Sequence, residues 1–307
     1  MYGPYETELK FLAGGTFAYV IPRPSNVGAT ISSFDNKPSC TYMGSLSHNF
    51  GLSFLSNVYG GLMSNCIAGP EEVSEYIDWT KSPGWPWTYL GLRTKQDFVQ
   101  HFKTVVFDPD SDPIWNMSGK MEAKELEDIL LNKIRVFIIP PIQLLWSQIK
   151  FGKRISLATK MFHWSYYGFN PYSGGFNRLA QRLLTKRWRG CYDVSGWDKF
   201  LPILSDVFRI IESCSSIPED LLPEFRWMVK NTVDFLSRSP NGHVLRRGYG
   251  NPSGSGTTTR DNIFAHIIIF AAGLFKAHLV KVGREPSLNF VFQQAVALFG
   301  DDNVFSV

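Results

Sequence analysis

Cysteine is scarce in this sequence, and the few cysteines form no recognisable pattern. Only 4 of the 307 residues are cysteine, and none belongs to a CxxC pair. The 6 histidines show no spacing typical of metal ligands either. These absences argue against a structural zinc site and a disulfide framework, and they favour a reducing compartment.

Long hydrophobic runs are also missing. The apolar stretch from Ile263 to Phe275 contains His266 and is shorter than the ~20 residues that a membrane span requires. We predict a buried helix there, with His266 as a core histidine that has a hydrogen-bond partner. The sequence begins MYGPYE, without the basic and apolar regions of a signal peptide. We therefore expect no membrane anchor in this chain.

Charged residues are few, but apolar residues are plentiful enough for a core. Charged residues make up 19% of the sequence, hydrophobic residues 44% and aromatic residues 15%. This balance predicts a globular protein and excludes a mostly disordered chain. The formal net charge of +4 agrees with a polyanionic partner without requiring one.

Acidic residues stand at the ends of two short runs. Asp193 follows the run that starts at Arg189, and Asp301 and Asp302 follow residues 295–300, AVALFG. We predict a buried strand for each run, with its acid at the end. Three carboxylates can hold two Mg²⁺ ions, and such a pair of ions can catalyse phosphoryl transfer. The Gly-Asp-Asp triplet by itself is weak evidence, because glycine followed by acids is common at strand ends.

A polar loop leads into the predicted buried helix. Residues 250–256, GNPSGSG, continue into residues 257–262, TTTRDN, and then into the apolar stretch. Just before this loop, two extended runs flank Pro240-Asn241-Gly242, and the Asn-Gly pair is a strong signal for a β-hairpin with a two-residue turn. The polar loop therefore lies between the two acidic runs in sequence order.

Three upstream segments are less specific. Residues 80–87, TKSPGWPW, contain two prolines and a glycine, which predict an ordered loop. An apolar face beside charged residues predicts a surface helix from Lys120 to Lys133. Residues 133–139 alternate basic and apolar side chains, which predicts a half-exposed strand with Lys133 and Arg135 on one face.

Taken in order, these segments resemble the sequence motifs of viral RNA-dependent RNA polymerases. Asp193-x4-Asp198 is similar to motif A, Ser253-Gly254-x3-Thr258-x3-Asn262 to motif B, and Gly300-Asp301-Asp302 to motif C. Lys124 with Lys133-Ile134-Arg135 resembles motif F, and Ser82-Pro83-Gly84-Trp85-Pro86 resembles motif G. The combination is specific and extends from about Thr80 to Val307. Within the family, the sequence looks most similar to picornaviruses, potyviruses and astroviruses, and among these to astrovirus-like relatives.

The resemblance implies a role for each of these residues. The catalytic acids, and the ligands of two Mg²⁺ or Mn²⁺ ions, would be Asp193, Asp301 and Asp302. Asp198 and Asn262 would recognise the ribose hydroxyls of the incoming nucleotide. The other residues of the substrate site would be Ser253, Gly254, Thr258, Arg135, Lys133 and Lys124. Ser82 and Gly84 would line the template entry, and Lys124 fits a solvated surface lysine almost as well.

The resemblance also implies an α+β fold, namely the fingers and palm of a right-hand polymerase with an antiparallel palm sheet and the thumb missing. We expect residues 1–79 to form an N-terminal or fingers region of unassigned role. Residues 80–185 would form the fingers with motifs G and F, and residues 186–307 the palm with motifs A, B and C. Motif D, a primer-grip hairpin and a thumb are not in the sequence. We therefore expect a fragment, and the missing parts argue against activity of this chain alone.

The implied activity is template-directed RNA synthesis from nucleoside triphosphates, for viral genome replication and transcription. Partners would be the RNA template, the nascent strand and other viral replication proteins, in the host cytoplasm at replication complexes. A reverse transcriptase shares the paired acids, but it is expected to place a bulky steric gate near the ribose instead of Asp198 and Asn262. A non-catalytic RNA-binding remnant of a polymerase is the other alternative, against which the intact acids argue.

Overall fold

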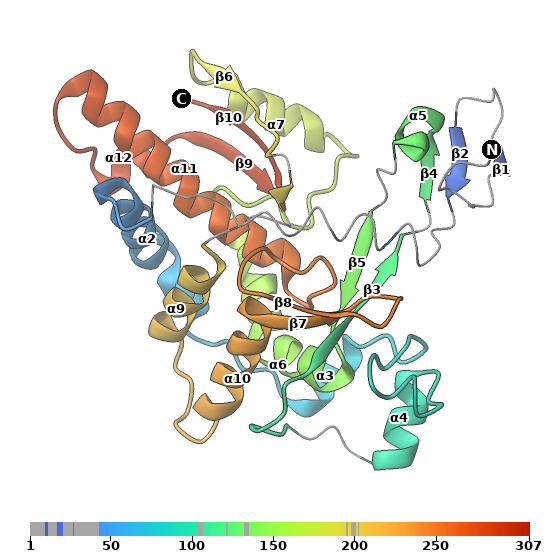
Figure 1. The fold of residues 1–307 in the computed structure, drawn as a ribbon. Coiled ribbons are helices and arrows are strands. Elements are labelled where there is room, and N and C mark those ends of the chain that lie inside the picture. Colours follow the sequence, from blue (N-terminus) through green and yellow to red (C-terminus); the bar gives the residue numbers. More distant parts are fainter. Residues whose placement is uncertain are drawn as a thin grey trace.

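The computed structural model is built from short strands and longer helices along the chain (Figure 1). It describes residues 10–11, 17–20, 27, 43–103, 107–120, 122–131, 135–194, 196–197, 201 and 203–307. Its helices are α2 (Leu46–Tyr59), α3 (Pro70–Glu75), α4 (Lys95–Phe102), α5 (Leu126–Leu130), α6 (Ile142–Ala158), α7 (Gly175–Leu183), α9 (Leu204–Cys214), α10 (Leu222–Val233), α11 (Thr258–Val282) and α12 (Leu288–Phe292), with 3-10 turns η1 (Gly60–Met63) and η2 (Thr159–Met161). Its strands are β1 (Lys10–Phe11), β2 (Phe17–Val20), β3 (Ile114–Gly119), β4 (Glu122–Glu125), β5 (Val136–Ile139), β6 (Arg189–Gly190), β7 (Phe235–Arg238), β8 (Val244–Arg247), β9 (Ala295–Phe299) and β10 (Asp302–Ser306). The mixture agrees with the predicted α+β class.

One sheet has the strand order β6-β10-β9, and all its pairs are antiparallel. The strand predicted before the Gly-Asp-Asp triplet is β9, and its residues 295–298 are buried, as expected. The strand predicted before Asp193 is shorter and less buried than expected. Only Arg189 and Gly190 pair with β10, and neither is buried. Among the described strands β6 pairs with β10 alone, and the prediction of a buried strand was wrong here.

A second sheet has the order β5-β3-β7-β8 and contains both parallel and antiparallel pairs. It confirms the predicted hairpin as β7–β8 and the predicted strand as β5. The hairpin turn is longer than predicted, because the Gly242 N–H donates to the Ser239 carbonyl oxygen and Pro240 lies inside the turn. Gly242 takes a positive φ of 88°, and Asn241 does not take a positive φ.

The helix predicted from Lys120 to Lys133 is mostly wrong. Residues Glu122–Glu125 form β4, which pairs antiparallel with β2, and among the described residues of this range only Leu126–Leu130 form a helix, the short α5. The partner strand lies about a hundred residues earlier in the sequence. A local pattern of charged and apolar residues could not reveal that pairing.

The long helix α11 runs through the core, as predicted for the apolar stretch, and α2 packs against it (Figure 1). The two helices come so close that a Cβ on Gly51 of α2 would overlap the carbonyl oxygen of Ile268. With 25 residues, α11 is longer than predicted and, by length and composition, could cross a membrane. More than half of its most apolar window is buried inside the protein, as in the core helix of a soluble domain. His266 is completely buried, as predicted.

Candidate active site

The turn between β9 and β10 presents two of the predicted catalytic acids. Phe299 pairs with Asp302, so Gly300 and Asp301 alone make the turn. Gly300 has a φ of 65° at the first turn position, where a two-residue hairpin of type II′ requires glycine. Asp301 and Asp302 are both exposed. The local sequence thus explains why these carboxylates face outward from the end of a buried strand.

Asp193 comes to the same end of the sheet through a pair of reciprocal hydrogen bonds. The Tyr192 N–H donates to Asn303 Oδ1 over 3.2 Å, and Asn303 Nδ2 donates to the Tyr192 carbonyl oxygen over 2.6 Å. These bonds extend the β6–β10 pairing by two residues and bring exposed Asp193 to the level of Asp302. Burial raises the pKa of the Tyr192 phenol to about 12.

The three acids share one edge of the sheet, but their side chains do not converge. In the part of the chain that the structure describes, no three His, Cys, Asp or Glu side chains form a group that could hold a metal ion. The donor chemistry nevertheless suits Mg²⁺ or Mn²⁺, which bind carboxylate oxygens and retain several waters. The match between these three acids and a Mg²⁺ or Mn²⁺ site therefore rests on the type of side chain and on the strand register. Asp198, the second acid of motif A, lies outside the described residues.

The polar loop before α11 packs against β5. The Gly254 N–H donates to the Ile138 carbonyl oxygen over 3.1 Å, and Ser253 Oγ donates to the Val136 carbonyl oxygen over 3.4 Å. A Cβ on Gly254 would overlap the carbonyl oxygen of Ile138, so only glycine permits this approach. The loop that resembles motif B is therefore in direct contact with β5, the strand that follows Arg135.

Two asparagines connect this loop with the first turns of α11. Asn251 Nδ2 donates to Asn262 Oδ1 over 2.7 Å and to the Thr258 carbonyl oxygen over 3.2 Å. Thr258 Oγ1 donates to the carbonyl oxygens of Pro252 and Ser255, 2.8 and 3.0 Å away. Asn262 Nδ2 makes no hydrogen bond within the described residues. Asn251, whose contact with Asn262 spans the loop, was not among the predicted site residues.

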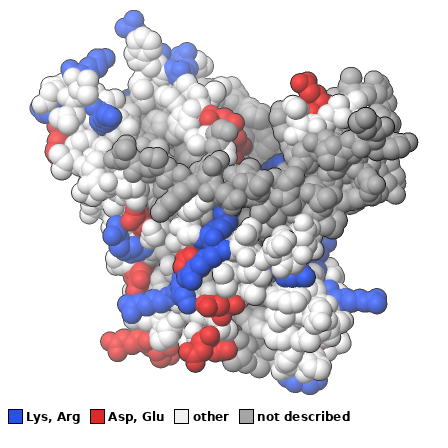
Figure 2. Space-filling view, viewed as in Figure 1, with Lys and Arg blue, Asp and Glu red and all other residues white. Residues whose placement is uncertain are grey.

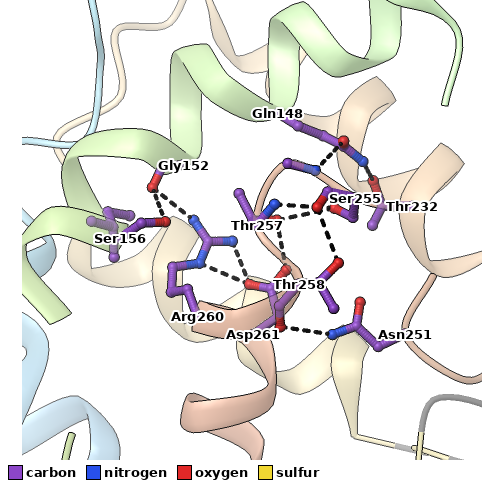
Figure 3. A network of polar contacts seen from close by, with 12 residues as sticks. Gln148, Gly152, Ser156, Thr232, Asn251, Ser255, Thr257, Thr258, Arg260 and Asp261 are labelled. Carbon is purple, nitrogen blue, oxygen red and sulfur yellow. Dashed lines mark hydrogen bonds and ion pairs between the residues drawn. The ribbon is translucent and has the colours of Figure 1, made fainter. Parts of the chain in front are cut away.

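A buried polar network holds the same loop from the other side (Figure 3). Arg260 donates to Asp261 through Nε, 2.8 Å away, and through Nη2, and it reaches the Gly152 carbonyl oxygen through Nη1. Thr257 Oγ1 donates to Asp261 Oδ2 over 2.6 Å. The side chains of Arg260 and Asp261 are 2% and 0% exposed. Burial raises the pKa of the Asp261 carboxyl, while Arg260 and Thr257 act in the opposite direction.

Gln148 of α6 completes this network. Its Oε1 accepts from the Gly256 N–H over 3.1 Å, and its Nε2 donates to Thr232 Oγ1 over 3.0 Å (Figure 3). Gln148 is fully buried. Its partners lie 108 and 84 positions away in the sequence, so no local motif could have identified it.

Two of the predicted motif F cations, Lys124 and Arg135, lie beside one acid. Glu122 lies 3.4 Å from Lys124 Nζ and 3.7 Å from Arg135 Nη1, measured from its carboxylate oxygens. The Lys124 side chain is only 15% exposed, so it is not the solvated lysine of the alternative interpretation, whereas Arg135 is 66% exposed. Lys133 lies outside the described residues. Among the described candidates, Arg135 is the more accessible cation.

The loop at residues 80–87 packs against the prolines that link β5 to α6, Pro140 and Pro141. Ser82 is exposed, and its Oγ accepts from the Gly84 N–H over 3.2 Å. Gly84 has a φ of 84°, and a Cβ there would lie 2.8 Å from Pro141 Cα. The Pro83 carbonyl oxygen accepts from the Ile142 N–H at the start of α6, over 2.9 Å. The segment is thus an ordered loop, as predicted.

Charge on the visible face does not by itself outline a site. Figure 2 shows Lys and Arg side chains spread over the upper and middle parts of this face, with a large group of Asp and Glu at its lower left. The predicted site therefore depends on the arrangement of particular residues, whereas comparison with known proteins identifies the family. The family model for viral RNA-dependent RNA polymerase matches residues 64–307. The chain belongs to this family.

Viral polyproteins are among the relatives of this polymerase-family chain. Genome polyprotein 1 of barley yellow mosaic virus (isolate Germany) is 28% identical over 267 residues, which cover 80% of the chain and 11% of the relative. Non-structural polyprotein 1AB of turkey astrovirus 1 is 26% identical over 246 residues, 74% of the chain and 15% of the relative. The genome polyprotein of blackberry virus Y is 27% identical over 202 residues, 64% of the chain and 6% of the relative. The predicted similarity to potyvirus-like and astrovirus sequences is confirmed, and the chain spans only a small part of each polyprotein.

Proposed function

We propose that this chain contributes the fingers and palm of a viral polymerase that synthesises RNA on an RNA template. Residues 80–185 would belong to the fingers and residues 186–307 to the palm. The observation that carries the proposal is the joining of Tyr192 to Asn303, which brings Asp193 to the edge of the sheet where Asp301 and Asp302 emerge. That shared edge is what a two-metal nucleotidyl-transfer site needs.

In the proposed reaction, the 3′-hydroxyl of the nascent strand attacks the α-phosphate of a nucleoside triphosphate, and pyrophosphate leaves. Asp193, Asp301 and Asp302 would hold two Mg²⁺ or Mn²⁺ ions, which supply Lewis-acid activation and charge neutralisation when bound. Arg135 and Lys124 would face the triphosphate together with Lys133, and Ser82 and Gly84 would line the template entry. Membership of the polymerase family supports these roles.

Selection of ribonucleotides would depend on Asn262 together with Asp198. Asn262 Oδ1 is engaged by Asn251, so Nδ2 is the atom that would donate to a ribose hydroxyl. Ser253 and Gly254 would form the loop beside the nucleotide, and Thr258 would support it through its bonds to Pro252 and Ser255. The contact between Gly254 and β5 would then transmit a movement of the loop to the strand that follows Arg135.

The partners and setting of this reaction are part of the same proposal. The chain would act on RNA and nucleoside triphosphates beside other viral replication proteins, in the host cytoplasm at replication complexes. Its relatives are polyproteins of positive-strand RNA viruses, which agrees with an origin among other viral products.

Primer extension tests the proposal directly. The polymerase that contains this chain is given an RNA primer on an RNA template, with ribonucleotides or deoxyribonucleotides and a divalent metal. Ribonucleotide incorporation is expected, and Asn262→Ala should reduce the preference for ribonucleotides, whereas Asn241→Ala at the β7–β8 turn should not. Preference for deoxyribonucleotides would point to a reverse transcriptase, and RNA binding without incorporation would point to a non-catalytic remnant.

A further inference from the structure

None of the roles above uses His266, which lies one turn after Asn262 on α11. Its side chain is 0% exposed, and its Nδ1 lies 3.0 Å from the carbonyl oxygen of Gly300. A carbonyl oxygen only accepts, so Nδ1 must carry the proton and donate. Nε2 has no hydrogen-bond partner within the described residues. The contact fixes both the tautomer and the direction of the ring.

The Gly300 carbonyl belongs to the turn that presents Asp301. In a two-residue hairpin turn, the ladder bonds are made by the flanking residues, here Phe299 and Asp302. The carbonyl of the first turn residue therefore has no partner in the ladder, and Gly300 is buried. A buried carbonyl needs a donor, and His266 supplies it from the neighbouring helix.

The same ring also touches the segment that carries Asp193. Its centroid lies 4.1 Å from that of Trp197, with the planes tilted by 30°, and 5.8 Å from that of Tyr192, in an edge-on arrangement at 70°. Tyr192 directly precedes Asp193, and Trp197 follows it by four positions. One imidazole thus joins α11, the motif A segment and the motif C turn.

We infer that His266 is a positioning residue that sets the place of Asp301 relative to Asp193 by holding the Gly300 carbonyl. Only the consequence for catalysis rests on the proposed function, because the contact between the helix and the turn exists without it. The effect passes through the backbone, and His266 itself does not touch the substrate. Small displacements of reacting groups reduce rates strongly, so a loose turn should slow catalysis.

Three variants separate the hydrogen bond from packing. His266→Phe keeps a buried ring beside Trp197 and removes the donor. His266→Asn keeps an N–H near the position of Nδ1 and loses the ring. His278→Phe is the control, because His278 is on the same helix and its Nδ1 also lies beside a backbone carbonyl, that of Arg284, at 2.9 Å and away from the turn.

Amide hydrogen exchange at residues 299–303, measured on the polymerase that contains this chain, reports how stable the turn is, whether or not the protein is active. The positioning role predicts about fivefold to tenfold faster exchange at Asp301 and Asp302 in His266→Phe, from the loss of one hydrogen bond. His266→Asn and His278→Phe should stay near wild type. Unchanged exchange in His266→Phe, or faster exchange in the Asn variant than in the Phe variant, would overturn the inference and assign His266 to packing.

Primer extension then measures the consequence for catalysis. His266→Phe should lower kcat about tenfold or more, with KM for the nucleotide unchanged, and His266→Asn should restore most of the rate. A rise in KM with kcat unchanged would contradict positioning of the acids. Failure of the wild-type protein to incorporate nucleotides would refute the proposed function, whereas the exchange comparison would still decide the role of His266.

Discussion

Replacing Arg260 with methionine should destabilise the protein more than the loss of an ordinary ion pair would. Arg260 belongs to the buried network in Figure 3. Its guanidinium group donates two hydrogen bonds to Asp261 and one to the Gly152 carbonyl oxygen. Methionine keeps much of the side-chain volume but leaves the Asp261 carboxylate, which is 0% exposed, without its counter-ion.

The expected loss is large because the remaining charge cannot reach water. Breaking a buried ion pair by removing one partner typically costs about 3–5 kcal/mol, a substantial part of the roughly 5–15 kcal/mol that stabilises a whole domain. Replacing both residues, in Arg260→Met with Asp261→Leu, should recover most of the loss. Gly152 O and Thr257 Oγ1 would each keep another partner, Ser156 Oγ and Ser255 Oγ.

Urea unfolding of the three proteins measures these differences, with Arg226→Met as the matched control. Arg226 pairs with Glu212 at 2.8 Å, but its side chain is 65% exposed, so its replacement should cost at most about 1 kcal/mol. The account would be refuted if Arg260→Met cost no more than Arg226→Met. It would also be refuted if the double variant were as unstable as the single one.

Three further substitutions or modifications have defined outcomes. Gly254→Ala should reduce ribonucleotide incorporation about 10–100-fold, because the new Cβ displaces the loop from β5. Gly248→Ala, whose Cβ would lie 3.9 Å from Asp234 Oδ1, should not, and equal rates in the two variants would contradict the contact. Gln148→Leu should lower the free energy of unfolding by about 1–3 kcal/mol, since the Gly256 N–H loses its acceptor; an unchanged urea midpoint would speak against this. Iodoacetamide at pH 8 should label exposed Cys191 well before Cys66, because burial raises the pKa of the Cys66 thiol and shields it, and mass spectrometry of labelled peptides would reveal the opposite order.

The parts of the fold that could be predicted from sequence are those with a strong local signal. The apolar run of α11, the Gly-Asp turn after β9 and the β7–β8 hairpin each have a periodicity or a turn residue that determines the local conformation. The prediction of a helix from Lys120 was wrong because β4 forms by pairing with β2, a strand far away in the sequence. The Asn-Gly pair predicted a two-residue turn, whereas the turn contains all three residues between the runs, Pro240, Asn241 and Gly242.

The site was predictable by residue type and much less by contact. The resemblance identified Asp193, Asp301 and Asn262 from their spacing, and the structure places the first two at one sheet edge. The residues that connect the segments, such as Asn303 and Gln148, were missed because each meets a partner more than 80 positions away. Such contacts leave no periodicity in the sequence. The predictions for Asp198 and Lys133 concern residues outside the described part of the chain, and they stay predictions.

The central claim is that Asp193 and Asp301 together form one catalytic centre. The most direct test is the rate of ribonucleotide incorporation in RNA-primed extension by Asp193→Asn and Asp301→Asn, with Asp220→Asn as an exposed acidic control on the loop before α10. The account predicts that either of the first two changes abolishes metal-dependent incorporation while RNA binding persists, and that Asp220→Asn retains the wild-type rate. Incorporation at the wild-type rate by Asp193→Asn or Asp301→Asn would contradict it.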